Sequence, residues 1–266
     1  MTIVKKYNII SAIESFCIVG IFFVIIRKIF DINMVVYIGL LSIIILVVLS
    51  KITWFYLIKK YLNILDKQLD PKKFLEITDI EFKSIEKRIS KRDLIYKNFL
   101  KLNYIAGYSC LNEKEKALEV LNTIDINESV KKSNFELIYC YNKSLLLLTL
   151  NKKEEANEMY EKLLEITEKN KKVKQKLPKE IAIYIEILKY WIYDENNTEK
   201  LLELYEKLLS TGKTKRFIIS TKFSLAELKE KQGKVEEAKK YYKEVVENGN
   251  KLYIVKKVKQ KLLELE

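Results

Sequence analysis

The pentapeptide Tyr-Glu-Lys-Leu-Leu occupies residues 160–164 and occurs again, unchanged, at residues 205–209. A third segment, Tyr-Lys-Glu-Val-Val at residues 242–246, repeats its pattern. A small or apolar residue stands four positions before each tyrosine, an aliphatic residue stands three positions after it, and the same spacing surrounds Leu121. The four alignments begin at Ala117, Ala156, Leu201 and Ala238. Spacings of four and three place such residues on one stripe of an α-helix, so we expect four similar helices that pack through this stripe.

The sequence around these segments is also helical in character. Beyond residue 60, glycine and proline are scarce, and no alternating apolar and polar pattern of useful length occurs. Asp70 and Pro71 form a helix start, with a capping side chain followed by proline at the first helical position. The sequence therefore predicts an all-α fold.

These units resemble the tetratricopeptide repeat, a helix-turn-helix unit that stacks into an α-solenoid. The resemblance covers about residues 91–250 and is carried by small and aromatic residues at matching places. They are Tyr108, Ala117 and Leu121, then Ser144, Leu147, Ala156 and Tyr160, and then Leu225, Ala226, Gly233, Ala238 and Tyr242, while the third unit has Lys189 and Leu201 where small residues are expected. The resemblance implies four stacked units. We expect residues 61–90 and 251–266 to cap their ends, because the end units of a solenoid expose an apolar face.

Two apolar runs precede the repeats, Ile9 to Ile26 and Met34 to Ser50. Each approaches the length that a helix needs to cross a bilayer. We expect residues 1–60 to form a two-helix transmembrane hairpin, with spans at about 8–27 and 34–57 and with lipid contacts from residues 8–58. Lys5, Lys6 and six lysines between residues 51 and 73 outnumber the two basic residues of the connecting loop, which predicts that both termini face the cytoplasm. The composition suits a bacterial plasma membrane protein.

Glu14 interrupts the first apolar run, and Lys51 follows the second. In an antiparallel hairpin they fall at the same depth, so an intramembrane pair is available, and ionisable residues in spans are costly. Alternatively, the second span ends at Ser50, Lys51 extends to the membrane surface, and residues 52–62 lie along it. The sequence leaves both arrangements open.

Catalytic chemistry is not expected. The chain has no histidine, which removes histidine-activated nucleophiles and most zinc and iron sites. Its three cysteines are far apart and form no metal-binding or disulfide pattern. We therefore expect no catalytic residues, no metal ligands and no cofactor, and interpret the protein as a membrane-anchored scaffold for protein–protein interaction.

The resemblance also implies where a protein or peptide partner binds, because the first helix of each unit generally lines the concave groove. The groove-facing residues would be Leu102, Ala106, Tyr141, Leu145, Glu186, Tyr190, Phe223 and Glu227. Rigid aromatic side chains are typical anchors of an interface. Two alternatives remain: these tyrosines belong to the core, or the helix at 252–265 fills the groove.

Lysine clusters support a different hypothesis, in which the protein binds anionic lipid or nucleic acid. Residues 169–179 contain six lysines and no acid, and Lys213, Lys215 and Arg216 form a second cluster. Only four of the 49 basic residues are arginine, the residue preferred for phosphate and base contacts, so nucleic acid is the less favoured ligand.

Overall fold

A computed structural model of the chain describes residues 1–26, 32–126, 135–172 and 179–265. Within these ranges the protein is entirely helical, with twelve α-helices and no strand. The helices are α1 (Ile3–Ile26), α2 (Ile32–Asp66), α3 (Pro71–Ile85), α4 (Lys91–Leu111), α5 (Lys114–Asn122), α7 (Phe135–Thr149), α8 (Lys153–Lys172), α9 (Lys179–Tyr193), α10 (Thr198–Ser210), α11 (Lys215–Lys231), α12 (Val235–Asn248) and α13 (Tyr253–Glu264). The all-α prediction is confirmed for the described residues.

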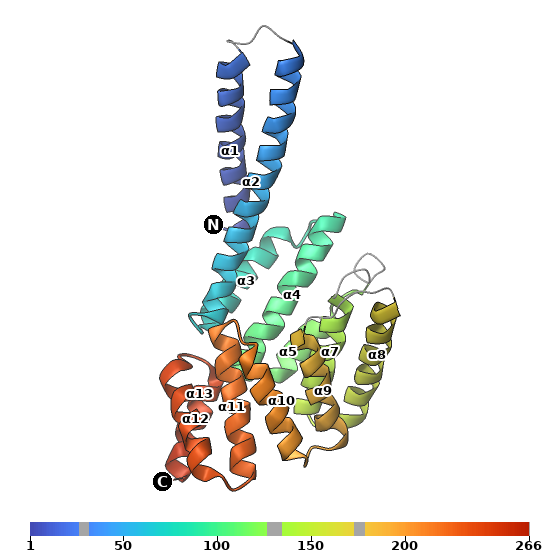
Figure 1. Cartoon of the computed structure of the whole chain (residues 1–266), viewed down its shortest axis with the longest axis vertical. Helices are drawn as coiled ribbons and strands as arrows, with labels where there is room; N and C mark the ends of the chain where they lie inside the picture. Colours follow the sequence, from blue (N-terminus) through green and yellow to red (C-terminus); the bar gives the residue numbers. More distant parts are fainter. Residues whose placement is uncertain (27–31, 127–134, 173–178, 266) are drawn as a thin grey trace.

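The first two helices form a long antiparallel hairpin that stands away from the other helices (Figure 1). Both are long and apolar enough to cross a membrane, and the most apolar window of each has no buried residue. Large apolar side chains such as Phe16, Phe23 and Tyr37 are more than half exposed along it. Apolar surface of this extent is rarely left in contact with water.

The second helix continues without a break from the hairpin into the repeat domain. Its last turns bury Leu57, Tyr61 and Leu65 against Phe74 of α3 and Ile3 of α1. Tyr61 also stacks on Phe74, with 4.7 Å between ring centroids. The expected boundary at residue 60 therefore falls inside α2, and no separate helix begins after Ser50. Because the single helix α2 belongs to the hairpin and also packs against α3 in the repeat domain, the hairpin and the domain share a rigid connection.

The expected pair of Glu14 and Lys51 is not formed. Thr53 donates a hydrogen bond to Glu14 over 2.6 Å, whereas Lys51 is exposed and makes no ion pair with Glu14. Two residues along an α-helix are separated by about 200°, so Thr53 and Lys51 cannot both face α1. The rotation of α2 therefore brings Thr53, and not Lys51, to Glu14.

Helices α4–α5, α7–α8, α9–α10 and α11–α12 form four successive hairpins. In three of their turns, a residue with positive φ stands five positions before the small residue of the packing stripe. These residues are Asn112, Asn151 and Gly233. Glycine and asparagine adopt this conformation most readily, which explains their presence there. The stripe residues Ala117, Ala156, Leu201 and Ala238 are all fully buried. The predicted packing stripe is therefore confirmed in each unit.

Each apolar cluster of the domain joins neighbouring units. One contains residues of α4, α5 and α7, a second contains residues of α7, α8 and α9, and a third contains residues of α9, α10 and α11. Such nearest-neighbour packing is the basis of solenoid stability.

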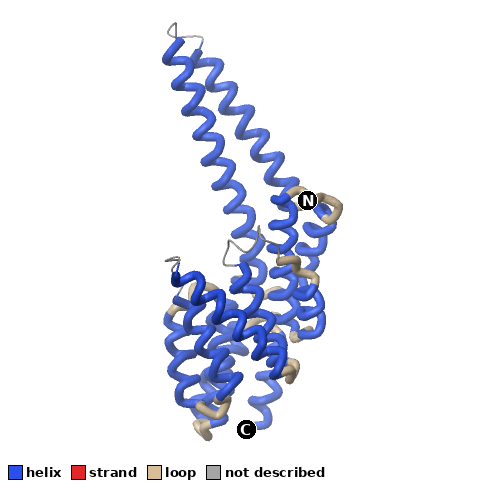
Figure 2. The backbone as a smooth tube through the Cα atoms, turned by 90° about the vertical axis from the view of Figure 1, so that its right-hand side faces the viewer, coloured by secondary structure: helices blue, strands red, loops and turns tan. Residues whose placement is uncertain are grey.

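The last unit returns to the first part of the chain. Arg216 of α11 pairs with Asp66 at the end of α2 over 2.7 Å, and Lys251 pairs with Asp70 over 2.5 Å. Asn250 donates to the carbonyl oxygen of Gln68, and the buried side chain of Leu69 belongs to the apolar cluster of α11, α12 and α13. We call residues 67–70 the α2–α3 turn. Asp66 and the turn are held by residues that follow them by 150 to 182 positions, so the array closes onto the base of the hairpin (Figures 1 and 2).

Candidate functional site

A hollow of about 500 Å³ lies between α7, α9, α10 and α11. We call it the inner hollow. A second hollow of about 330 Å³, the outer hollow, lies between α9, α11 and α13. Trp191 and Ser224 line both, so the two hollows are adjacent, and we call them together the groove. Its size is in the range of ordinary ligand sites.

Aromatic side chains from successive units form the wall of the inner hollow. Tyr141 of α7 packs on Tyr184 of α9 with 5.1 Å between ring centroids, and Tyr184 meets Phe217 of α11 edge to face at 6.2 Å. Trp191 donates its indole N–H to the hydroxyl of Tyr205 over 3.2 Å. Within the described chain, no hydrogen bond engages the hydroxyl of Tyr141 or Tyr184. Both are therefore available to a ligand.

Arg216 is the one charged side chain among the described residues that line the inner hollow, and it is paired with Asp66. Burial alone would lower its pKa, but the neighbouring Cys110 and Asp66 outweigh burial and raise it, so the guanidinium stays charged. Burial raises the pKa of Tyr184 to about 12, so this phenol remains a neutral hydrogen-bond donor. The hollow thus combines apolar surface, hydroxyl donors and one arginine whose charge is paired with Asp66.

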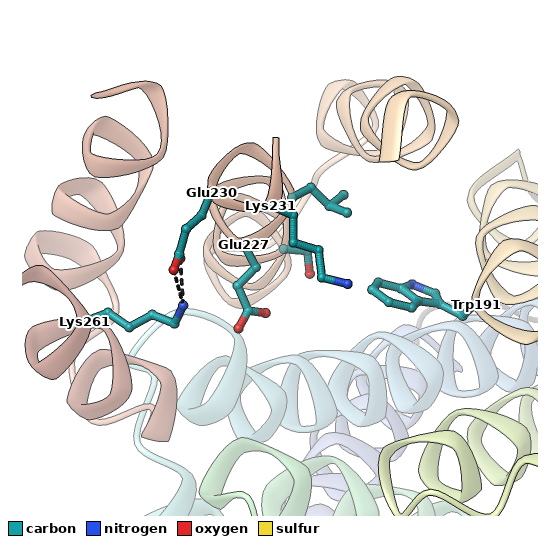
Figure 3. A pocket seen from close by; sticks show the side chains of 7 residues that line it. Trp191, Glu227, Glu230, Lys231 and Lys261 are labelled. Atoms are coloured by element: carbon teal, nitrogen blue, oxygen red, sulfur yellow. Dashed lines mark hydrogen bonds and ion pairs between the residues drawn. The ribbon is translucent and has the colours of Figure 1, made fainter. Parts of the chain in front are cut away.

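The outer hollow is charged and is bounded by the last helix. Figure 3 shows Lys261 of α13 reaching Glu230 of α11, and Lys231 directed toward the ring of Trp191. The Lys231 ammonium lies 5.6 Å from the centroid of that ring, a cation–π distance. Glu227 of the same wall accepts a 2.7 Å bond from Lys257. These contacts fasten α13 along the edge of the groove.

The Glu230–Lys261 pair predicts a specific acid response. Burial by itself would raise the pKa of Glu230, but hydrogen bonds from Lys261 and Tyr242 outweigh it and hold the pKa below its ordinary value. A lowered folded-state pKa stabilises the fold above the pKa of the unfolded glutamate, about 4.3, and this contribution disappears as the pH falls through the folded-state value. We expect Lys261→Met to flatten the fall in melting temperature between about pH 5 and pH 3. Lys256→Met, at an exposed position of the same helix, is the control, and equal slopes in both variants would contradict the prediction.

Tyr141 and Leu145 line the inner hollow, as expected. Four of the other expected residues lie against neighbouring helices. Leu102 packs against the cluster of α4, α5 and α7, and Ala106 packs against the cluster around α2. The ring of Phe223 lies 5.0 Å from the ammonium of Lys257 and packs against the carboxyl-terminal cluster, and Glu227 is held by the same lysine. The carboxyl-terminal helix therefore covers the expected groove face of the fourth unit, which was one of the two alternatives.

Glu186 and Tyr190 are not among the residues that line the inner or the outer hollow. The residues of α9 that line the inner hollow are Tyr184, Ile187, Leu188 and Trp191. Tyr190 packs into the cluster of α9, α10 and α11. One position along a helix is a rotation of about 100°, so a shift from residue 190 to residue 191 changes the face completely.

Four residues that line the inner hollow were not predicted from the sequence: Tyr184, Trp191, Arg216 and Phe217. An available signal was the spacing of Tyr184, Leu188 and Trp191, which is the i, i+4, i+7 stripe of a helix face. That stripe was hidden because the third unit lacks the small residues by which the helices were aligned. Arg216 was counted only as part of a lysine cluster.

No group of three or more histidine, cysteine, aspartate or glutamate side chains that could hold a metal occurs in the described ranges. Cys140 is buried and Cys110 half-buried, and burial raises the pKa of both thiols. Neither cysteine therefore has the lowered pKa of a reactive thiol. The groove has the composition of a binding site.

A family model described as tetratricopeptide repeat matches residues 137–170 and 219–248. These ranges correspond to α7–α8 and to most of α11–α12. The two matched units are tetratricopeptide-like repeats. Units of this kind generally mediate protein–protein interaction and are typically not enzymes. No curated protein and no solved structure matches the chain.

Proposed function

We propose that the protein is a membrane-anchored scaffold whose repeats bind a partner protein on the cytoplasmic side of the plasma membrane. The anchoring part rests on the exposed apolar hairpin and on the lysine bias at its base. The binding part rests on the repeats and on the groove at their inner face.

The observation that carries the proposal is the wall of Tyr141, Tyr184 and Phe217, which crosses three units. Rigid aromatic side chains give large contact area at a small cost in conformational entropy. An extended peptide segment lying across the units would meet each ring in turn. The expected protein or peptide partner therefore remains the favoured ligand.

The lysine clusters support the alternative less well. Of the second cluster, Lys213 pairs with Glu180 over 3.2 Å and Arg216 pairs with Asp66, so two of its three charges are engaged. Residues 173–178 of the first cluster, with two of its six lysines, lie outside the described residues.

Photo-crosslinking tests the groove directly. A benzophenone amino acid in place of Tyr184 should crosslink one discrete partner protein in native membranes, because this side chain lines the inner hollow. The same amino acid in place of Tyr193, an exposed position of the same helix, should not. Ser224→Trp, which fills both hollows, should abolish the crosslink, whereas Ser210→Trp at an exposed position of α10 should preserve it. Equal crosslinking from residues 184 and 193 would contradict the proposal.

A further inference from the structure

The connection between α3 and α4 and the first turn of α4 form a surface that is both basic and apolar. We call residues 87–95 the α4 tip. Lys87, Arg88, Lys91 and Arg92 are all exposed and include two of the four arginines of the chain. No ion pair joins any of these four to a described residue. Glu86 and Asp93 are the acids of this stretch, so residues 86–95 have a net charge of +2 (four basic minus two acidic).

Apolar side chains stand between these charges. Ile89 is 86% exposed, and Leu94 and Ile95 are 41% and 47% exposed. Single exposed apolar residues are normal on a soluble surface, but three within seven residues, interleaved with four unpaired cations, are typical of segments that lie on a membrane. Cationic side chains near such a surface are attracted to anionic headgroups.

The α4 tip lies beside the base of the hairpin. Both views place the α3–α4 connection at the level of the amino terminus, where α1 begins (Figures 1 and 2). Trp54 of α2 meets Tyr96 of α4 edge to face at 5.3 Å and Tyr7 of α1 at 5.2 Å. Tryptophan and tyrosine are the residues most enriched at the boundary between bilayer and water. The tip is thus at the depth of the expected interface.

A hollow of about 360 Å³ opens between the two elements. Its walls are Trp54 and Ile58 of α2 and Ile95, Tyr96 and Phe99 of α4, and Arg92 is its one charged lining residue among those described. Because α4 begins at the tip and runs away from the hairpin, Phe99 lies about 10 Å farther along the helix than Arg92. Arg92 therefore stands at the headgroup end of the hollow.

We propose that the α4 tip binds an anionic phospholipid of the bilayer that holds the hairpin. The phosphate is bound by Arg92 with help from Arg88 and Lys91, and the acyl chains extend from there into the bilayer beside the hairpin. This site fixes the height and orientation of the repeat domain relative to the membrane. The inference rests on the proposed membrane anchoring and adds a second, lipid-specific contact to it.

Tryptophan quenching in bilayers tests the inference on the full chain. Trp191→Phe leaves Trp54 as the sole tryptophan, at the wall of the hollow. The protein is reconstituted in mixed bilayers in which bromine is carried either by the acyl chains of phosphatidylglycerol or by those of phosphatidylcholine. We expect quenching of Trp54 to show about a fivefold preference for the anionic lipid. Replacing Lys87, Arg88, Lys91 and Arg92 together by glutamine should remove that preference.

Two controls separate the possible failures. The matched charge change, Lys240, Lys243, Lys256 and Lys259 to glutamine, is made at exposed positions of α12 and α13 and should keep the preference. Leu41→Trp with both native tryptophans replaced by phenylalanine reports whether the hairpin is in the bilayer, because Leu41 is an exposed residue of the second apolar run.

The remaining outcomes distinguish a failure of the proposed membrane anchoring from a failure of the lipid site. If tryptophan at residue 41 is not quenched, the membrane anchoring is wrong and the lipid site is wrong with it. If residue 41 is quenched but Trp54 is quenched equally by both lipids, or by neither, the anchoring stands and the lipid site is overturned. Quenching by neither would mean that protein covers the hollow. A preference that survives the loss of all four basic residues, or that the control variant also loses, equally overturns the assignment.

Discussion

Replacement of Leu69 by alanine is expected to lower the free energy of unfolding by about 2–5 kcal/mol, the usual range for a fully buried leucine. Leu69 is 0% exposed and lies in the cluster formed by α11, α12 and α13, although it belongs to the α2–α3 turn. Its loss leaves a cavity where the carboxyl-terminal unit contacts the base of the hairpin. Hydrogen exchange measured by mass spectrometry should therefore accelerate in α11 and α13 before it does in α7 and α8.

The backbone conformation of Leu69 predicts how glycine and alanine compare at this position. Its φ is +55°, and the other three non-glycine residues with positive φ in the described chain are all asparagine. The left-handed conformation costs a residue with a Cβ roughly 1–2 kcal/mol of conformational free energy, which burial of the leucine side chain offsets. Leu69→Gly should therefore destabilise no more than Leu69→Ala.

Leu100, equally buried but inside α4, provides the matched comparison. There glycine should be about 1 kcal/mol worse than alanine, because it is unfavourable in a helix interior. Denaturant titrations in detergent of the four variants measure both differences. The same glycine penalty at both positions would show that Leu69 is not strained.

Glu81→Gln is expected to destabilise the protein by about 1.5–3 kcal/mol, the value of hydrogen bonds to a charged group. The Glu81 side chain is 1% exposed and accepts backbone N–H groups of Ile3 at 2.5 Å and of Val4 at 3.0 Å. It therefore caps the amino-terminal end of α1 from α3, where a negative charge also complements the helix dipole. Glutamine retains one acceptor oxygen but loses the charge.

Glu76→Gln is the control, since Glu76 is an exposed residue of the same helix. Denaturation in detergent should separate the two variants clearly, and amide exchange at Ile3 and Val4 should increase in Glu81→Gln alone. Equal stability of the two variants would show that Glu81 does not hold the start of α1.

Much of the local structure could be predicted because it depends on spacing along the chain. The stripe through Ala156, Tyr160 and Leu163 identifies a buried helix face with no knowledge of its neighbours, and these residues are buried. Asp70 and Pro71 likewise begin α3, where the carboxylate of Asp70 accepts the N–H of Lys73 over 3.2 Å. Tyr141 and Leu145, which line the inner hollow, were named from the resemblance to tetratricopeptide arrays and not from this periodicity.

The groove as a whole could not be predicted, because it depends on how the helices are rotated against one another. A rotation of about 100° separates Tyr190 from Trp191, and no local pattern fixes it in a unit that lacks the small packing residues. The burial of the Phe223 ring depends on α13, which follows Phe223 by about 30 residues and covers the ring. In the hairpin, the same kind of rotation brings Thr53 rather than Lys51 to Glu14.

The helices, their order, their buried stripes and the apolar hairpin could all be predicted from the chain, since each depends on residues within a few turns of one another. Three features depend instead on tertiary packing: the array closes onto the α2–α3 turn, Glu81 caps a helix 77 residues away, and Arg216 lies between Asp66 and the inner hollow. These contacts join side chains whose separation along the chain carries no periodic signal. Their partners are chosen by the packing angles of all the intervening helices, which only the folded chain sets.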